Sequence, residues 1–487
     1  MLKRFPLSYS IACTQHLKTL RHLGQAVLLD SGYPKCQRGR YDIISAAPMA
    51  TLFSDNGKLG GTNLPFATSE INDPFEALKQ LQAFALSQLS EGFIEAISTD
   101  LDLPFCGGLL GHFSYDLGRS IEQLPSIAEH DTQLPEMHLG LYSWAVIVDH
   151  QQQQSYLIGS DLVTQADFDA IAKLLTEQST SPSAPQNNLG HLSSSVSSSH
   201  DESENFSLTS DFSSNVDEAN YHSALQKIDD YILSGDCYQV NFAQRFKASC
   251  KGDPLAAYLT LREAAPTHFS AFIDTERGAI LSLSPERFLR VDSEQQVMTQ
   301  PIKGTQPRSA DPIQDQANID YLHNSEKDQS ENLMIVDLMR NDISKSCQLH
   351  SVKVPSLFAV ESYRNVHHLV STVTGKLEND QCAIDLLHNC FPGGSITGAP
   401  KIRAMEIIDE LEPHRRSVYC GSIGYISLCG KMDTSITIRT LLVEDNNIYC
   451  WAGGGIVADS VIESEYQETF DKVNNLLNAL RSSHLSS

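Results

Sequence analysis

A lysine in a glycine-containing turn is the residue of this chain best suited to act as a nucleophile. Lys303 lies in segment 301–308, which reads PIKGTQPR. A lysine amine attacks carbon only where its surroundings keep it uncharged. The position therefore predicts covalent catalysis, provided that the chain binds an electron-poor substrate beside it.

Two pairs of carboxylates could hold a divalent cation. Asp328 and Glu331 are three residues apart in one predicted helix, and Glu465 and Glu468 have the same spacing in another. This spacing places both side chains of a pair on one helix face, and Mg²⁺ prefers carboxylate oxygens and water. Either pair alone is more simply a solvated helix face. Both pairs together, with the features below, favour a magnesium site for a small di-acid.

Other polar and glycine residues could bind the rest of such a substrate. The segment 391–401, FPGGSITGAPK, leads into a predicted helix whose N-terminus could hold a carboxylate. A glycine run at 453–455 follows a predicted strand and would let the backbone approach a ligand closely. Arg439, within a predicted strand, has a guanidinium group that suits a carboxylate, and Tyr419 could add a hydrogen bond.

Two further residues have alternative interpretations. His368 could act as an acid or base, and a purely structural role is at least as consistent with its spacing. Glu286, in the segment 284–288 (SPERF), could simply pair with Arg287. It could also be a general acid whose pKa is raised by burial.

The composition is that of an acidic globular protein. The 487 residues are enough for two or three domains or one large interleaved domain. The formal net charge of -25 opposes binding to nucleic acid or an anionic membrane, but it does not exclude a locally positive site for an anionic substrate. The eleven cysteines include no C-x-x-C pair, so we expect reduced thiols in a cytoplasmic protein. No apolar run predicts a signal peptide or a membrane span.

The elements that must position these residues are helices and paired strands on both sides of a serine-rich segment. Segment 178–215 is predicted to be a flexible linker between an N-terminal region, 1–177, and a catalytic region, 216–487. Helices are predicted at 217–235, 316–342, 383–388, 401–411 and 465–482. Strands are predicted at 237–246, 366–374, 421–428, 435–443 and 448–452. Because helices and strands do not alternate regularly, an α+β fold is expected.

Several segments, in this order, resemble the chorismate-utilising enzymes. They are 113–119 (FSYDLGR), 235–246 (GDCYQVNFAQRF), 284–286 (SPE), 331–342 (ENLMIVDLMRND), 394–401 (GSITGAPK) and 456–460 (IVADS). The resemblance covers essentially the whole chain apart from the linker. It implies a large sandwich of two packed antiparallel β-sheets flanked by helices, like that of anthranilate synthase component I.

Two positions indicate a branch of this family. Anthranilate synthases carry alanine where this chain has Lys303, and members that use water carry lysine where it has Gln239. The chain therefore resembles the branch that transfers an amino group to C4 of chorismate, in 4-aminobenzoate and folate biosynthesis. The chief alternative is an anthranilate synthase, and another is a non-catalytic subunit that keeps the pocket.

The resemblance also implies the role of each site residue. Lys303 would be the nucleophile and Glu286 the general acid. Mg²⁺ would be bound directly by Glu331 and Glu468 and through water by Asp328, which is shorter than the glutamate of anthranilate synthases, and by Glu465. The metal would bind the ring carboxylate of chorismate. The implied substrate-binding residues are Gln239, Gly304, Thr305, His368, Thr397, Tyr419, Arg439, Gly453, Gly454 and Gly455.

The resemblance further implies a reaction and partners. Lys303 would attack C2 of chorismate as the C4 oxygen leaves, and ammonia would then add at C4 and expel the lysine. No glutaminase motif is found in the chain, so a glutamine amidotransferase is expected to supply ammonia in a heterodimer. Segment 28–31 (LLDS) resembles the stretch that lines the tryptophan pocket of anthranilate synthases, but the companion segment differs, at 265–270 (APTHFS). We therefore expect no strong inhibition by tryptophan, although tryptophan could bind as a structural ligand.

Overall fold

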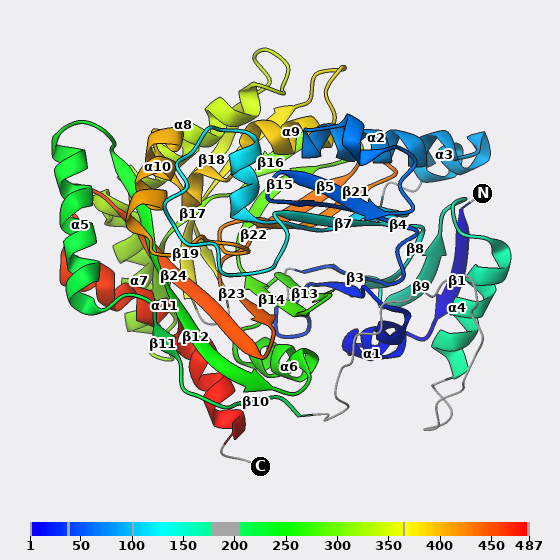
Figure 1. Ribbon diagram of the computed structural model, residues 1–487, viewed down its shortest axis with the longest axis horizontal. Helices are drawn as coiled ribbons and strands as arrows, with labels where there is room; N and C mark the ends of the chain where they lie inside the picture. Colours follow the sequence, from blue (N-terminus) through cyan, green and yellow to red (C-terminus); the bar gives the residue numbers. More distant parts are fainter. Residues whose placement is uncertain (1, 37–38, 100–101, 178–204, 364–365, 485–487) are drawn as a thin grey trace.

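Two large antiparallel sheets lie at the centre of the molecule (Figure 1). The computed structural model describes residues 2–36, 39–99, 102–177, 205–363 and 366–484. Among these residues, the larger sheet has 13 strands and the smaller has 11. The predicted α+β fold with two packed antiparallel sheets is confirmed.

The larger sheet mixes strands from both ends of the chain. Its order is β1 (Lys3–Leu7), β9 (Gln154–Gly159), β8 (Trp144–Asp149), β3 (Tyr41–Ser45), β2 (Val27–Asp30), β13 (Phe269–Thr275), β14 (Gly278–Ser284), β23 (Thr440–Glu444), β24 (Asn447–Ile456), β12 (Gln239–Lys251) and β10 (Ser207–Leu208). Two more short strands, β11 (Ser213–Ser214) and β20 (Gly398–Ala399), also pair with β12.

The smaller sheet is mixed in the same way. Its order is β17 (Ile302–Pro307), β19 (Val366–Lys376), β16 (Gln296–Thr299), β15 (Arg287–Val291), β22 (Met432–Ile436), β21 (Ser422–Ser427), β6 (Gly108–Phe113), β7 (Met137–Tyr142), β4 (Ala50–Asp55) and β5 (Lys58–Thr62), with β18 (Lys353–Ser362) paired to β19. A continuous apolar core lies between the two sheets and includes Ile43 and Ile147 of the larger sheet and Leu109 and Ile423 of the smaller.

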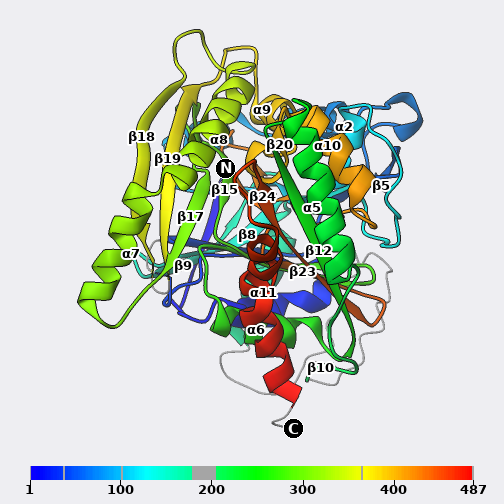
Figure 2. The ribbon, with the colours of Figure 1, turned by 90° about the vertical axis from the view of Figure 1, so that its left-hand side faces the viewer.

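Helices cover the outer faces and the ends of the sheets (Figure 2). The α-helices are α1 (Thr14–Leu20), α2 (Pro74–Ser87), α3 (Glu91–Thr99), α4 (Gln165–Glu177), α5 (Glu218–Leu233), α6 (Pro254–Ala264), α7 (Pro312–Asn324), α8 (Glu326–Ser344), α9 (Ala383–Cys390), α10 (Lys401–Leu411) and α11 (Ile462–His484). The 3₁₀ turns are η1 (Arg21–Leu23), η2 (Thr68–Glu70), η3 (Tyr115–Ser120) and η4 (Gly394–Ile396). None of the helices in the described part of the chain is long and apolar enough to cross a membrane.

Local sequence signals explain several helix boundaries. The Asp217 carboxylate accepts a hydrogen bond from Asn220 N and starts α5, whose buried face includes Leu225 and Ile228 as expected. The predicted helix at 401–411 is confirmed as α10. The predicted helix at 316–342 is wrong as one element, because Ser325 is extended. Its side chain accepts a hydrogen bond from Asp328 N and starts a second helix, α8.

Two strand predictions also need correction. The predicted strand at 435–443 is two strands, β22 and β23, separated by a connection in which Arg439 has a φ of 51°. The glycines at 453–455 do not follow a strand, because β24 continues through Ile456. There the glycine backbones pair with residues 241–243 of β12, so they form part of a sheet surface.

The predicted linker overlaps the larger sheet at its C-terminal end. Residues 178–204 lie outside the described residues. β10 and β11, which lie within 205–215, pair with β12 and belong to the larger sheet. The regions 1–177 and 216–487 contribute strands to both sheets, with β2 beside β13 and β6 beside β21.

Candidate active site

A break in the pairing of β17 with β19 positions Lys303. Lys303 lies opposite Leu369, and the register then shifts so that Thr305 lies opposite His368. Gly304, between them, has a φ of 78°, a conformation that favours glycine. A Cβ atom at Gly304 would lie 3.0 Å from Cγ of Asp328. The bulge therefore brings Lys303 close to the first turn of α8.

The two predicted acidic pairs lie near this lysine. Nζ of Lys303 is 3.8 Å from Oε2 of Glu331, on α8. On α11, Oε1 of Glu465 accepts a hydrogen bond from the Ser460 hydroxyl at 2.7 Å. A Cβ atom at Gly454 would lie 3.0 Å from Oε2 of Glu465 and 3.9 Å from Oε1 of Glu468. The glycine surface of β24 thus leaves room for both carboxylates of α11.

Lysine side chains offset the crowding of negative charge. Burial raises the pKa of Glu331, and Asp328 and Glu465 add to this effect, while Lys303 and Lys327 oppose it. Partial desolvation raises the pKa of the half-exposed Glu468 carboxylate, but Lys472, whose Nζ is 2.6 Å away, together with the charges of Lys303 and Lys327, outweighs it, so the net pKa is lowered. Nζ of Lys327 is 3.4 Å from Oε1 of Glu465. The carboxylates therefore act on one another electrostatically, as expected for a cation site.

The four site carboxylates offer the oxygen ligands that Mg²⁺ prefers. Their oxygen atoms do not form a tight cluster. Among the described residues, no three of the four site carboxylates have oxygen atoms within 4.8 Å of one another. Lysine side chains lie against Glu331, Glu465 and Glu468 instead. An ion that keeps several waters needs only one or two direct carboxylates, so a magnesium site does not require three of them to cluster. Glu465 is buried and Glu468 is exposed, so only Glu468 matches a solvated helix face.

Glu286 is a buried acid next to Lys303. Burial raises its pKa to about 7, although hydrogen bonds from Ser395 and the Ile302 backbone and the charges of Lys303 and Arg439 oppose this rise. Pairing with Arg287, the simpler interpretation from the sequence, is wrong, because Arg287 binds Asp433 and the Gln300 side chain. Glu286 can therefore hold a proton near neutral pH, as a general acid must.

Arg439 and His368 lie at a neighbouring cavity of about 840 Å³. Arg439 forms no ion pair with any residue that the structure describes, and its nearby acid is Glu286. Nδ1 of His368 and Oγ1 of Thr305 are hydrogen-bonded at 2.8 Å. Burial and the charge of Arg439 lower the pKa of His368 to about 3, so this imidazole is neutral at physiological pH. Arg439 thus presents a guanidinium group without an ion pair to any described residue, and this group is suited to a ligand carboxylate.

The side chains of Gln239 and Lys303 both lie beside Gly455 of β24. A Cβ atom at Gly455 would lie 2.2 Å from Nε2 of Gln239 and 3.2 Å from Nζ of Lys303. Gln239 is buried, and its Oε1 has no hydrogen-bond partner among the described residues. An unpaired buried oxygen of this kind is expected to bind a ligand or water.

Two predicted residues make their contacts elsewhere. The Thr397 hydroxyl donates to the Gly393 carbonyl at 3.0 Å within its own turn, and that turn reaches the site through the pairing of β20 with Gln239. Tyr419 is buried, with its ring 6.4 Å from that of Trp451 and 5.8 Å from the Arg416 guanidinium. For both residues, any role in ligand binding remains a prediction.

Four site residues were not anticipated from the sequence, namely Lys327, Ser395, Ser460 and Lys472. Lys472 stands four residues after Glu468, the spacing of an ion pair on a helix, so its position could have been inferred. Lys327 adjoins Asp328 in the sequence, but its partner Glu465 lies on another helix. Such contacts between distant elements have no local signal.

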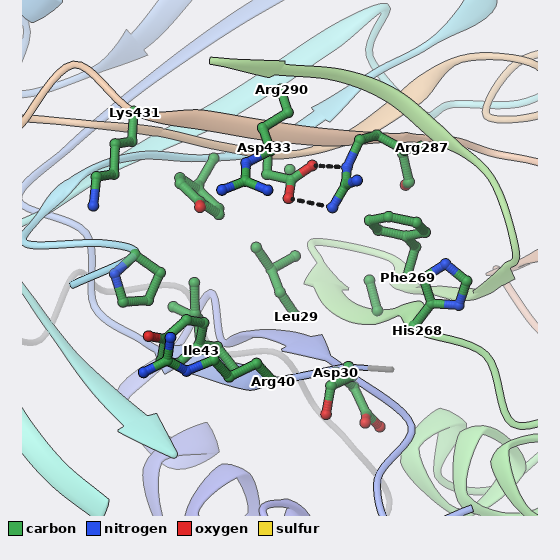
Figure 3. Close-up of a pocket in the computed structure, with 18 of the residues that line it drawn as sticks. Leu29, Asp30, Arg40, Ile43, His268, Phe269, Arg287, Arg290, Lys431 and Asp433 are labelled. Atoms are coloured by element: carbon green, nitrogen blue, oxygen red, sulfur yellow. Dashed lines mark hydrogen bonds and ion pairs between the residues drawn. The ribbon is translucent and has the colours of Figure 1, made fainter. Parts of the chain in front are cut away.

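A second cavity, of about 520 Å³, lies between the two sheets (Figure 3). Leu29 and Ile43 of the larger sheet face Arg287 and Asp433 of the smaller sheet across it. Segments 28–31 and 265–270, which the sequence related to a tryptophan pocket, both contribute to its lining.

Behind this cavity, Cys13, Asp30 and Asp42 have ligand atoms within 4.8 Å of one another. Asp30 already accepts hydrogen bonds from Arg262 and Tyr258. Asp42 is likewise paired, with Nε2 of His150 at 2.7 Å. Neither carboxylate therefore needs a metal ion.

The chain is similar to known proteins in sequence and in fold. The model of a family described as chorismate binding enzyme matches residues 26–478. Aminodeoxychorismate synthase component 1 of Escherichia coli (strain K12) is 49% identical over 96% of this chain and 95% of its own length. The Salmonella typhimurium protein of the same name is 47% identical over 96% of each chain. The crystal structure of anthranilate synthase component I from Streptococcus pneumoniae TIGR4 matches with a TM-score of 0.73 and 30% identity, over 90% of this chain and 92% of that one.

Proposed function

Since this chain belongs to the family of chorismate binding enzymes, we propose that it converts chorismate and ammonia to 4-amino-4-deoxychorismate. The observation that carries the proposal is the placement of Lys303 near both the Glu286 acid and the Glu331 carboxylate. Anthranilate synthases of the family carry alanine at the lysine position, so this residue favours amination at C4. The product would serve 4-aminobenzoate and folate biosynthesis.

The residues of the site can divide one difficult displacement into two easier steps. Hydroxide is a poor leaving group, and protonated Glu286 can donate to the C4 oxygen as it departs as water. Lys303 attacks C2, and the ring double bonds shift towards C4. Ammonia then adds at C4, the double bonds shift back, the C2–N bond to Lys303 breaks to release its neutral amine, and the proton lost by the new C4 ammonium returns to Glu286. Each step is easier than direct exchange of hydroxide for ammonia.

The acidic residues would hold magnesium on the other side of the lysine. Glu331 and Glu468 would bind the ion directly, and Asp328 and Glu465 would hold its waters. When bound, magnesium supplies positive charge that orients the ring carboxylate and withdraws electrons from the ring. The exposed carboxylate of Glu468 and the oxygen-rich donor set support this division.

The free guanidinium of Arg439 would bind the second carboxylate of the substrate, in the enolpyruvyl group. Thr305, held by neutral His368, and the backbone of Gly304 would flank it. The amide of Gln239 lies near Lys303, and its unpaired oxygen would accept a hydrogen bond from ammonia or substrate. A glutamine cannot deprotonate water, which is consistent with an enzyme that uses ammonia.

We further propose two partners. A glutamine amidotransferase would supply ammonia, as the name component 1 of the relatives suggests. Tryptophan would occupy the cavity between the sheets as a structural ligand, which the volume of about 520 Å³ and its lining by segments 28–31 and 265–270 support. Turnover should therefore be insensitive to micromolar tryptophan, and inhibition in that range would contradict this role.

Product analysis tests the proposal. The purified chain is incubated with chorismate, Mg²⁺ and ammonium, with and without a lyase that removes pyruvate from aminodeoxychorismate, and products are separated by chromatography. We expect an amino product that keeps its enolpyruvyl group until the lyase is added and then yields 4-aminobenzoate. Fluorescent anthranilate without lyase would identify an anthranilate synthase, and no consumption of chorismate would identify a binding subunit.

A further inference from the structure

Two cysteines from distant parts of the sequence meet at one end of the smaller sheet. β6 and β21 are paired as far as Gly108 and Ser427, and the Leu428 amide donates to the Gly107 carbonyl at 2.8 Å. Cys106 and Cys429 are the next residues outward on these two segments. The antiparallel pairing thus brings two thiols together across most of the chain.

Both sulfur atoms contact the same hydroxyl group. Sγ of Cys429 donates to Oγ of Ser427 at 3.2 Å, and Sγ of Cys106 lies 3.3 Å from that oxygen. The same oxygen accepts a hydrogen bond from the Cys106 amide at 3.1 Å. The two thiols are therefore close neighbours on backbones that the sheet holds in place, which a disulfide requires.

The two thiols differ in exposure and in acidity, as do the attacking and the resolving thiol of a redox pair. Cys106 is fully buried, whereas Cys429 is partly exposed. Hydrogen bonding with Cys106 lowers the pKa of Cys429 despite its burial, and Ser427 and Lys431 assist. The same hydrogen bond, together with burial, raises the pKa of Cys106. An oxidant that reaches the pair from solvent would therefore meet the more acidic thiol first.

We propose that Cys106 and Cys429 form a site of reversible oxidation by peroxide. The Cys429 thiolate attacks a peroxide oxygen. An S–O bond forms, the O–O bond breaks, hydroxide leaves, and the thiolate is oxidised to sulfenic acid. The Cys106 sulfur then attacks the Cys429 sulfur. An S–S bond forms, the S–O bond breaks, and the oxygen leaves as water with the Cys106 proton. A small thiol reduces the disulfide again.

The disulfide would join two neighbouring segments of the smaller sheet that border the cavity between the sheets. Pro104 and Lys431, each two residues from one of the cysteines, line that cavity. Nζ of Lys431 already donates to the Leu103 carbonyl at 2.8 Å across the same seam. A covalent bond here would close a very long loop of chain, so oxidation should raise the unfolding temperature.

The test is oxidation of the intact protein with hydrogen peroxide, followed by alkylation of free thiols and peptide mass mapping. We expect a cross-linked peptide pair containing Cys106 and Cys429, with two fewer titratable thiols and full recovery after dithiothreitol. Cys106→Ser and Cys429→Ser should each abolish the cross-link. Cys382→Ser, which removes another partly exposed thiol, should leave it unchanged.

Several results would overturn the proposal. One is further oxidation of Cys429 to sulfinic acid while Cys106 remains open to alkylation after unfolding. Another is resistance of both thiols to peroxide that oxidises free cysteine. The wild-type mapping does not depend on the folding of any variant. As a second measurement, the unfolding temperature should rise on oxidation of the wild type and should not rise in either single variant.

Discussion

Substitutions of Lys303 can distinguish a role as nucleophile from a role as a positive charge. Lys303→Ala should lower ammonia-dependent turnover by about 100-fold or more, the size typical of the loss of a catalytic group. Lys303→Arg keeps a charge beside Glu331, which is 3.8 Å from Nζ, but a guanidinium stays protonated and cannot attack carbon. Steady-state formation of aminodeoxychorismate measures both variants.

The two variants should therefore be similarly impaired. Lys58→Ala, on the exposed strand β5, is the control and should behave like the wild type. Substantial recovery of turnover in Lys303→Arg would show that the charge matters and that no covalent intermediate forms.

The Glu286 carboxyl should make turnover depend on pH. Its pKa is raised to about 7, mainly by burial, and the proposed role requires the protonated form. Turnover should therefore fall as the pH rises above about 7. Glu286→Gln cannot donate this proton, so we expect a loss of roughly 100-fold or more and no remaining decline from this group. A pH–rate profile of both proteins from pH 5.5 to 9 provides the check.

The raised pKa of Glu286 should also make the free energy of unfolding depend on pH. The folded protein holds a proton on Glu286 up to about pH 7, whereas the unfolded chain releases it near 4.5. Its stabilising contribution is therefore complete below pH 4.5 and is lost as the pH rises through about 7. Glu286→Gln should gain stability relative to the wild type over this range, by roughly 3 kcal/mol at about 1.4 kcal/mol per pKa unit. Urea unfolding of both proteins at pH 5 and pH 8 measures the difference in their free energies of unfolding. The same difference at both pH values would contradict the raised pKa.

At the scale of elements, the glycine surface of β24 decides whether α11 can present its acids. A Cβ atom at Gly454 would lie 3.0 Å from Oε2 of Glu465, so Gly454→Ala should displace that carboxylate. We expect the Mg²⁺ concentration for half-maximal turnover to rise by about 10-fold or more, as for other changes around a metal site. Magnesium titration of turnover measures this effect.

Gly92→Ala is the matched control, because a Cβ atom there meets nothing within 4 Å. It should leave the magnesium requirement unchanged. An unchanged requirement in Gly454→Ala as well would show that the α11 pair does not serve the ion.

Local signals in the sequence predicted elements well where one residue determines a boundary. Asp217 defines the start of α5, and Pro400 precedes α10 as expected. Ser325 followed by Asp328 is also a helix-start signal, but the apolar spacing on both sides suggested one continuous helix. The turn at Arg439 had no such signal, because a non-glycine residue rarely adopts a φ of 51°.

The sequence allowed prediction of which residues take part in the candidate site, but not of how they contact one another. Residue types identified Lys303, Glu286 and the two acidic pairs, and the structure brings them together. The lysines between the acids, the free oxygen of Gln239 and the position of Tyr419 beside Trp451 depend on contacts between distant strands. Such contacts follow from sheet order, which hydrophobic periodicity does not encode.

For the whole molecule, the two sheets make the regions 1–177 and 216–487 interdependent. β2 pairs with β13 in one sheet, and β6 pairs with β21 in the other. We therefore expect the two regions to stay together after cleavage between them. A protease site inserted within 178–204, cut to completion, should leave fragments that elute together and keep their turnover.

The uncut insertion variant is the control for any effect of the inserted sequence. Separation of the fragments on gel filtration without denaturant would show that the regions fold independently. Production of 216–487 alone gives a second measure, since it should aggregate with the β13 and β21 edges exposed.

The pairing of β6 with β21 also has a consequence for synthesis of the chain. β6 leaves the ribosome long before β21 is made, and the delay is on the order of tens of seconds at ordinary elongation rates. Throughout that interval one edge of the nascent strand lacks its hydrogen-bonding neighbour. We expect newly made chains to depend on chaperones that shield this edge, and their yield to fall when translation is slowed between the two strands.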